Sequence, residues 1–189
     1  MFLSIVTAPA EALTLAEAKA HLRVDNDDGD DYIQSLIEVA LTHLDGPLGA
    51  TGQCIGAQEW AYSFNARSAE SVRVPIVPAT SLESITYFDS AGAEQTANVA
   101  DFLLLARTDR TDIAPLQGKA WPATYDRPDA ITVTLGAGVG LPANVRHAAL
   151  LLISHWHENR SAVNIGNIVN EIPLSVQTLV NQSRVGWVG

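Results

Sequence analysis

The chain has 189 residues, of which 47% are hydrophobic and 17% are charged, so it can build a sizeable core and is not a wholly disordered chain. Its longest apolar run, residues 148–153, is far shorter than the roughly 20 residues that cross a bilayer, so we expect no membrane span. Residues 2–8 are fairly apolar, but they are short for a secretion signal and no Lys or Arg precedes them. The single cysteine, Cys54, excludes an intramolecular disulfide and is typical of a chain made in a reducing cytoplasm.

The net charge of −10 is unevenly distributed along the chain. Residues 1–50 carry a net charge of −7, residues 51–140 carry −4, and residues 141–189 carry +1. Proteins that bind the phosphates of nucleic acids need Lys and Arg side chains to displace counterions. The charge therefore argues against DNA binding, although DNA can pass an acidic surface without sticking to it.

Residues 1–54 have the patterns of two helices. Thr14 and Glu17 have the spacing of a capping box, which predicts a helix that runs to about residue 24. Apolar residues at helical spacing then predict a second helix over 33–44, and Gly46 with Pro47 ends it. We expect these N-terminal helices to form a hairpin.

From residue 55 to residue 140 the apolar period changes from 3.6 to 2, which predicts short strands separated by turns. Phe102 to Leu105 is a further candidate strand, and residues 89–92 have the composition of a turn. We expect an inserted antiparallel β barrel or sandwich over 55–140. The alternating residues are Trp60, Tyr62 and Phe64; Val72, Val74 and Ile76; Ile85 and Tyr87; and Ile131, Val133 and Leu135.

Residues 141–163 are predicted to form a long helix that joins the N-terminal helices in one helical domain. This helix is apolar nearly all round, which indicates burial on more than one side. We therefore expect a contact with other subunits at Leu150, Leu151, Ile153 and Trp156.

Residues 164–189 are too apolar for a solvated tail, and Trp187 has the character of an interface anchor. We expect an extended docking arm here, which completes an α+β fold of helical domain, inserted β domain and arm. The residues predicted to dock are Leu174, Val176, Leu179, Val180, Arg184, Val185, Trp187 and Val188.

The patterns that suggest chemistry are weak. Asp25–Asp31 does not fit the register of a calcium-binding EF-hand loop, so we interpret it as a turn whose carboxylates cap and favour the start of the next helix. Gly136–Gly140 lacks the third glycine of a dinucleotide-binding motif and is interpreted as a flexible hinge. His155 and His157 lie two residues apart on a predicted helix, so their side chains point in different directions. We expect no enzyme, no cofactor and no metal.

Three stretches together resemble the head–tail connector (adaptor) proteins of tailed phages and gene transfer agents. The first is Leu13–Asp25 with the helix that follows it. The second is Trp121-Pro122 with Arg127–Val133, which enters a Gly-rich turn. The third is Leu151–Arg160 followed by Glu171–Val180. His157 stands where the family more often has Tyr, and the chain ends in an apolar Val185–Gly189.

The resemblance implies a structural protein of the virion, at the head–tail junction. It implies a homo-oligomeric ring, of 12 subunits in the family, that binds the portal protein on one side and the next neck or tail component on the other. It also implies that the C-terminal arm inserts into the portal and that DNA passes through the ring without specific binding.

Three alternatives remain open from the sequence. One is a neck or tail-terminator ring that does not touch the portal. The second is a small metal-dependent enzyme that uses Asp25–Asp31 or His155–Glu158. The third is a ligand-binding β domain with helical additions, which predicts a stable monomer.

Overall fold

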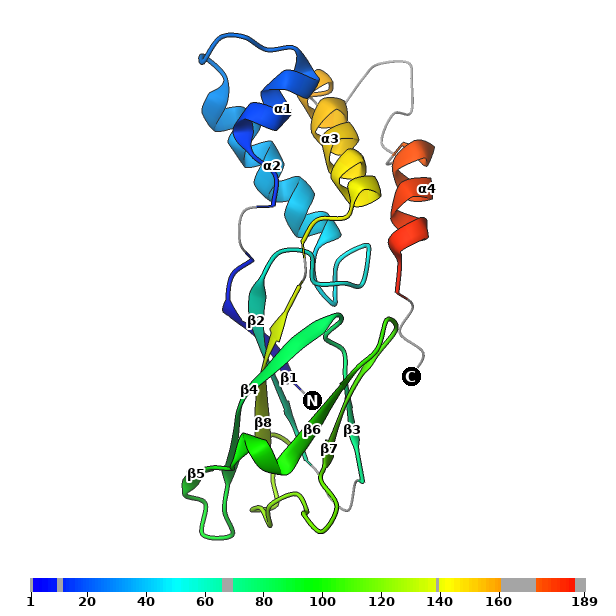
Figure 1. Ribbon diagram of the computed structural model, residues 1–189. Helices are drawn as coiled ribbons and strands as arrows, with labels where there is room; N and C mark the ends of the chain where they lie inside the picture. Colours follow the sequence, from blue (N-terminus) through cyan, green and yellow to red (C-terminus); the bar gives the residue numbers. More distant parts are fainter. Residues whose placement is uncertain (1, 10–11, 66–69, 139, 161–172, 186–189) are drawn as a thin grey trace.

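The computed structural model describes residues 2–9, 12–65, 70–138, 140–160 and 173–185. Figure 1 shows a helical domain at one end and a β domain at the other, so the molecule is elongated and mixed α+β. The helices are α1 (Leu15–Leu22), α2 (Asp30–Leu44), α3 (Ala143–Glu158) and α4 (Leu174–Ser183), with a short 3₁₀ turn, η1 (Val99–Asp101).

The β domain contains two antiparallel sheets that share one core. The larger sheet has the strand order β1-β2-β8-β4-β5, and the smaller one has the order β3-β7-β6. Trp60, Phe64, Ile113 and Val133 are among the buried residues between the sheets. The strands are β1 (Phe2–Thr7), β2 (Gln58–Phe64), β3 (Val72–Val74), β4 (Ala79–Phe88), β5 (Glu94–Thr96), β6 (Phe102–Ala106), β7 (Thr111–Pro115) and β8 (Ile131–Ala137).

All the strands predicted from alternation are present, because their inward residues fill this core. In β2 the burial pattern alternates without exception, as the sequence indicates for Trp60, Tyr62 and Phe64. The turn at 89–92 is also present: the Asp89 side chain accepts hydrogen bonds from the backbone N–H groups of Ala91 and Ala93. Two polar strands, β5 and β7, were not predicted, because neither has the apolar alternation.

The predicted N-terminal helices are confirmed as α1 and α2. Thr14 and Glu17 form both hydrogen bonds of the capping box. Leu13 and Ala18 on either side of the cap are fully buried. One apolar core then joins α1, α2, α3 and α4, with Ile33, Ile37 and Leu152 among its fully buried members.

The N-terminal segment differs from the prediction, because residues 2–7 are not helical. They form β1, which pairs antiparallel with β2 and extends the larger sheet. A short apolar run does not reveal which strand it will pair with, so the sequence reading assigned this segment to the helical domain.

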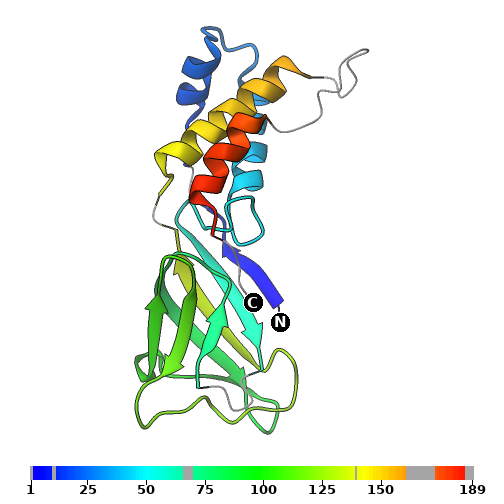
Figure 2. The ribbon, with the colours of Figure 1, turned by 90° about the vertical axis from the view of Figure 1, so that its right-hand side faces the viewer.

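The C-terminal segment also differs from the expected extended arm. Residues 174–183 form α4, which packs against α3 (Figure 2). Val176 and Val180 lie four residues apart on one face of α4 and are buried against the helical core. The predicted arm residues Trp187 and Val188 lie outside the described residues.

The glycine-rich connection between β8 and α3 is held by backbone hydrogen bonds and does not form the flexible hinge that the sequence predicts. The backbone N–H groups of Gly138 and Gly140 donate to the carbonyls of Pro78 and Ile55. Gly138 has φ +86°, and a Cβ atom there would lie 2.0 Å from the carbonyl oxygen of Gly56. The glycine is required because the two backbone segments touch.

Candidate interaction surfaces

The residues predicted to dock divide into two groups in the structure. Val176 and Val180 are buried within the chain, so they stabilise the subunit itself. Leu174 is 79% exposed at the start of α4, and Arg184 is exposed just after its end. Leu179 and Val185 are half-buried. The outer surface of this segment therefore offers Leu174 and Arg184 to a partner.

Polar contacts fasten the C-terminal end of α4 to the rest of the chain. The Asn144 side chain, at the start of α3, donates 2.6 Å to the Ser183 hydroxyl. The Gln53 side chain donates to the Ser183 carbonyl. The Val185 N–H donates 2.9 Å to the Thr51 carbonyl. These bonds give the described C-terminal segment a defined direction where it leaves the helical domain.

A hollow of about 620 Å³ lies between α4 and the loop that follows α2. Val176, Val180 and Asn181 line it from the helix, and Leu48 lines it from the loop. Leu48 is 90% exposed, the largest exposed fraction among the large apolar side chains described. A partner that contacts Leu174 and Arg184 can reach this hollow as well, since Arg184 also lines it.

Of the four α3 residues predicted to contact a neighbouring subunit, three have surface available for such a contact. Ile153 is fully buried in the helical core of its own chain, which leaves no surface for another subunit. Leu150, Leu151 and Trp156 are half-buried at the edge of that core and keep part of their surface free. The contact itself stays a prediction.

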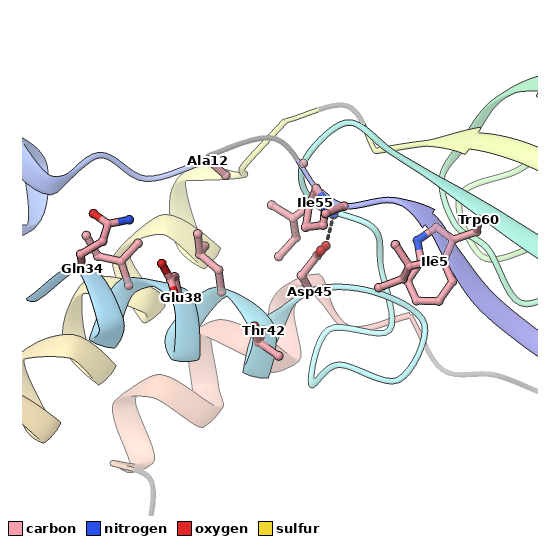
Figure 3. Close-up of a pocket in the computed structure, with 13 residues that line it drawn as sticks. Ile5, Ala12, Gln34, Glu38, Thr42, Asp45, Ile55 and Trp60 are labelled. Carbon is pink, nitrogen blue, oxygen red and sulfur yellow. Dashed lines mark hydrogen bonds between the residues drawn. The ribbon is translucent and has the colours of Figure 1, made fainter. Parts of the chain in front are cut away.

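A second hollow, of about 550 Å³, lies where the two domains meet (Figure 3). Ile5 of β1 and Trp60 of β2 line it from the β domain, and Ile37, Glu38 and Leu41 of α2 line it from the helical domain. The sequence did not predict this hollow, because the hollow forms only where β1 lies beside the end of α2. The apolar character of residues 2–8 was the only available signal.

Asp45 holds this junction together from the end of α2. Its carboxylate accepts a hydrogen bond from the backbone N–H of Ile55, and the Gln58 side chain donates to both of its oxygens, at 3.1 and 3.0 Å. Gln58 in turn accepts 2.6 Å from the Trp60 indole N–H. This series of hydrogen bonds thus links the end of α2 to the first residues of β2.

The acidic run Asp25–Asp31 is held by a lysine. The Lys19 ammonium lies 2.6 Å from Asp27 and 2.7 Å from Asp30, and these partners raise the pKa of Lys19. The residue that caps α2 is Gly29, and no side chain bonds to this cap, so the prediction of a carboxylate cap is wrong. Asp30 and Asp31 do lie in the first turn, where the helix dipole favours them.

Features that would suggest chemistry are scarce in the described part of the chain. Within it, no group of three or more His, Cys, Asp or Glu residues is placed to hold a metal ion. Cys54 is buried, and burial raises the pKa of its thiol to about 12, so little thiolate forms at neutral pH. Among these same residues, no helix has the length and apolar character needed to cross a membrane.

The structure is an elongated α+β protein with exposed apolar side chains in both domains, such as Leu174 and Ile5. Residues 12–99 match the sequence model of the phage gp6-like head-tail connector protein family. The resemblance to head–tail connector proteins that the sequence indicates is therefore confirmed. No significant match is found among curated proteins.

Solved structures with the same fold come from gene transfer agent (GTA) particles. The neck of an empty GTA particle, computed with C6 symmetry, contains a chain with 24% sequence identity and a TM-score of 0.79. A chain in the virion of a native GTA particle has 23% identity and a TM-score of 0.78. The neck of a native GTA particle, computed with C12 symmetry, contains one with 22% identity and a TM-score of 0.71. Each match covers 100% of this chain and 97% of the other.

Proposed function

We propose that this chain is a structural subunit of the neck, where it forms a ring at the head–tail junction of a phage or GTA particle. The observation that carries the proposal is the similarity over the whole chain to proteins of GTA necks, with both domains included. The match to the head-tail connector family supports the same position. The C12 symmetry of one of these necks favours a ring of 12 copies.

We propose that the C-terminal segment binds the portal protein. Leu174 is exposed at the start of α4 and Arg184 just after its end, and the hollow with Leu48 lies beside Arg184. The chain continues for four residues beyond Val185, and these include the apolar Trp187 and Val188. An aromatic and apolar anchor beside an arginine is typical of protein interfaces.

The ring would surround the path of the DNA. A net charge of −10 repels phosphates, which suits a channel that must release its cargo. Leu150, Leu151 and Trp156 of α3 are proposed to contact the neighbouring subunit near the portal. The next neck or tail component would then bind the opposite side of the ring.

Portal binding is tested by a pull-down of the portal protein from the same particle. We expect the full chain to bind, and we expect Leu174→Asp, Arg184→Glu and a chain that ends at Val185 each to bind at least tenfold more weakly. Truncation after Ser161 is less informative, because it also removes Val176 and Val180 from the core. Tyr125→Asp is the matched control, since Tyr125 is a 53% exposed side chain of the β domain.

No portal binding by the full chain would contradict the portal contact and favour a neck or tail-terminator ring that does not touch the portal. Equal binding by the full chain and by all three variants would show that the C-terminal segment is not the docking element.

A further inference from the structure

The outer edge of the larger sheet is apolar and has no neighbouring strand within the described part of the chain. β1 is the last strand of that sheet and pairs with β2 on one side only. Its sequence, FLSIVT, contains no charged residue and no proline. Phe2, Ile5 and Val6 are 60%, 53% and 55% exposed. Soluble proteins usually protect such an edge with charges, proline or a covering segment, because an open edge pairs readily with another chain.

The smaller sheet also ends in an apolar strand, part of which lies near β4 of the larger sheet. β6 is its last strand and has the sequence FLLLA. Phe102 and Leu104 point into the core, while Leu103 faces outward and is 45% exposed. Leu116, just after β7, is 42% exposed. The two remaining edge strands are only three residues long and carry a charge, Arg73 in β3 and Glu94 in β5.

These two edges face in opposite directions. Figure 2 shows β1 near the N-terminus on one side of the β domain and the β6–β7 hairpin on the other. We call them the β1 flank (Phe2, Ile5, Val6 and the hollow beside α2) and the β6 flank (Leu103, Leu116 and the hairpin turn). Glu38 is exposed at the hollow of the β1 flank, and Arg107 and Asp109 are both exposed in the hairpin turn of the β6 flank.

We propose that the β1 flank of one copy packs against the β6 flank of the next copy, and that this contact closes the ring. The proposal rests on the neck ring proposed above and specifies the surfaces that build it. Rotation about a ring axis brings two different surfaces of identical subunits together, so each subunit must carry two complementary patches on opposite sides. The two apolar edge strands, β1 and β6, meet this requirement, and Arg107 of the hairpin turn is free to pair with Glu38 of the next copy.

The contact is tested by crosslinking between engineered cysteines. Ser4 lies on β1 and Ala106 ends β6; both are exposed, and both are close to cysteine in size. Rings of the S4C/A106C double variant, assembled on the portal and verified by electron microscopy, are treated with a flexible bis-maleimide. The wild-type chain is the control, because its only thiol, Cys54, is buried and weakly acidic.

We expect the double variant to give a ladder of covalent oligomers up to the size of the ring, and each single variant to stay monomeric on a denaturing gel. Rings that are visible by microscopy but give no ladder would overturn this contact and leave the proposed neck function intact. Covalent dimers from either single variant would show a symmetric contact and would also overturn it. Absence of rings on the portal would instead contradict the proposed function on which the contact rests.

Discussion

Asp45 is the residue that couples the two domains most directly. Its carboxylate sits at the end of α2 and accepts hydrogen bonds from Ile55 and Gln58, at the beginning of the β domain. Substitution by Ala leaves these donors unpaired at a partly buried site, where an unsatisfied group costs about 1–3 kcal/mol.

We therefore expect Asp45→Ala to lower the free energy of unfolding by about 1–3 kcal/mol, measured by urea denaturation. Asp109→Ala is the control, because Asp109 is exposed in the β6–β7 turn. A change within about 0.5 kcal/mol for Asp45→Ala, as expected of an ordinary surface site, would show that the junction does not depend on this carboxylate.

Glu17 makes stability depend on pH at the start of α1. Hydrogen bonds from the Thr14 backbone and side chain, with a further contribution from Arg146, lower the pKa of Glu17 below its ordinary value of 4.5. Because the pKa is lowered in the folded state, the stabilisation is fully present above the ordinary pKa and is lost as the pH falls through the folded value.

We expect wild type to have a higher Tm than Glu17→Gln at pH 7, and we expect this difference to shrink as the pH falls from about 5 to 3. The measurement is the Tm of both chains across this range by circular dichroism. A difference that stays constant with pH would mean that the ionised carboxylate is not what stabilises the cap.

Among the elements, the turn from β8 into α3 depends on a close approach of two backbones. Gly138 has φ +86°, and a side chain there would collide with Gly56. Gly118 has a similar φ of +80° but has open space around it. Comparing alanine substitutions at the two positions therefore separates two losses of folding stability: one from the left-handed backbone, which both share, and one from the collision with Gly56, which only Gly138 has.

We expect Gly118→Ala to cost about 1–2 kcal/mol of stability, from the left-handed backbone alone. Gly138→Ala should cost clearly more, because the backbone of Gly56 must also move. Both are measured by thermal and urea unfolding. Equal losses in the two variants would contradict the close packing of the connection and favour the flexible hinge that the sequence alone suggests.

The sequence predicts an element well when its apolar residues pack into a core within the same subunit. Strand β2 and helix α2 were predictable, since Trp60, Tyr62 and Phe64 alternate and Ile33, Ile37 and Leu44 recur at helical spacing toward cores within the subunit. In α4, Val176 and Val180 carry the same helical signal, but a short apolar segment after Pro173 fits an interface arm equally well.

The candidate surfaces were predictable only in part. Leu174 and Arg184 stand out in sequence as residues of an apolar C-terminal segment, and the structure places them outside. The β1 flank was not predictable, because its exposure results from strand pairing between residues far apart in the sequence. Ile5, for example, pairs with Trp60, 55 positions away, and no local pattern encodes such a pairing. Ile153 was misjudged because a helix that is apolar all round does not reveal which face its own chain covers.

At the scale of the whole molecule, we propose that the two domains make different contacts in the assembly. In the proposed assembly, the helical domain would present the C-terminal segment to the portal, and the β domain would present its two apolar flanks to neighbouring copies. Neither domain has a described cluster of groups suited to bind a metal. The proposed position in a particle is the claim on which the other proposals depend.

The most direct measurement of that position is a cryo-electron microscopy reconstruction of the neck in particles that carry this chain. We expect a ring of copies of this fold between the portal and the tail, with the C-terminal segment of each copy against the portal. A neck whose rings are all built from other chains would contradict the account.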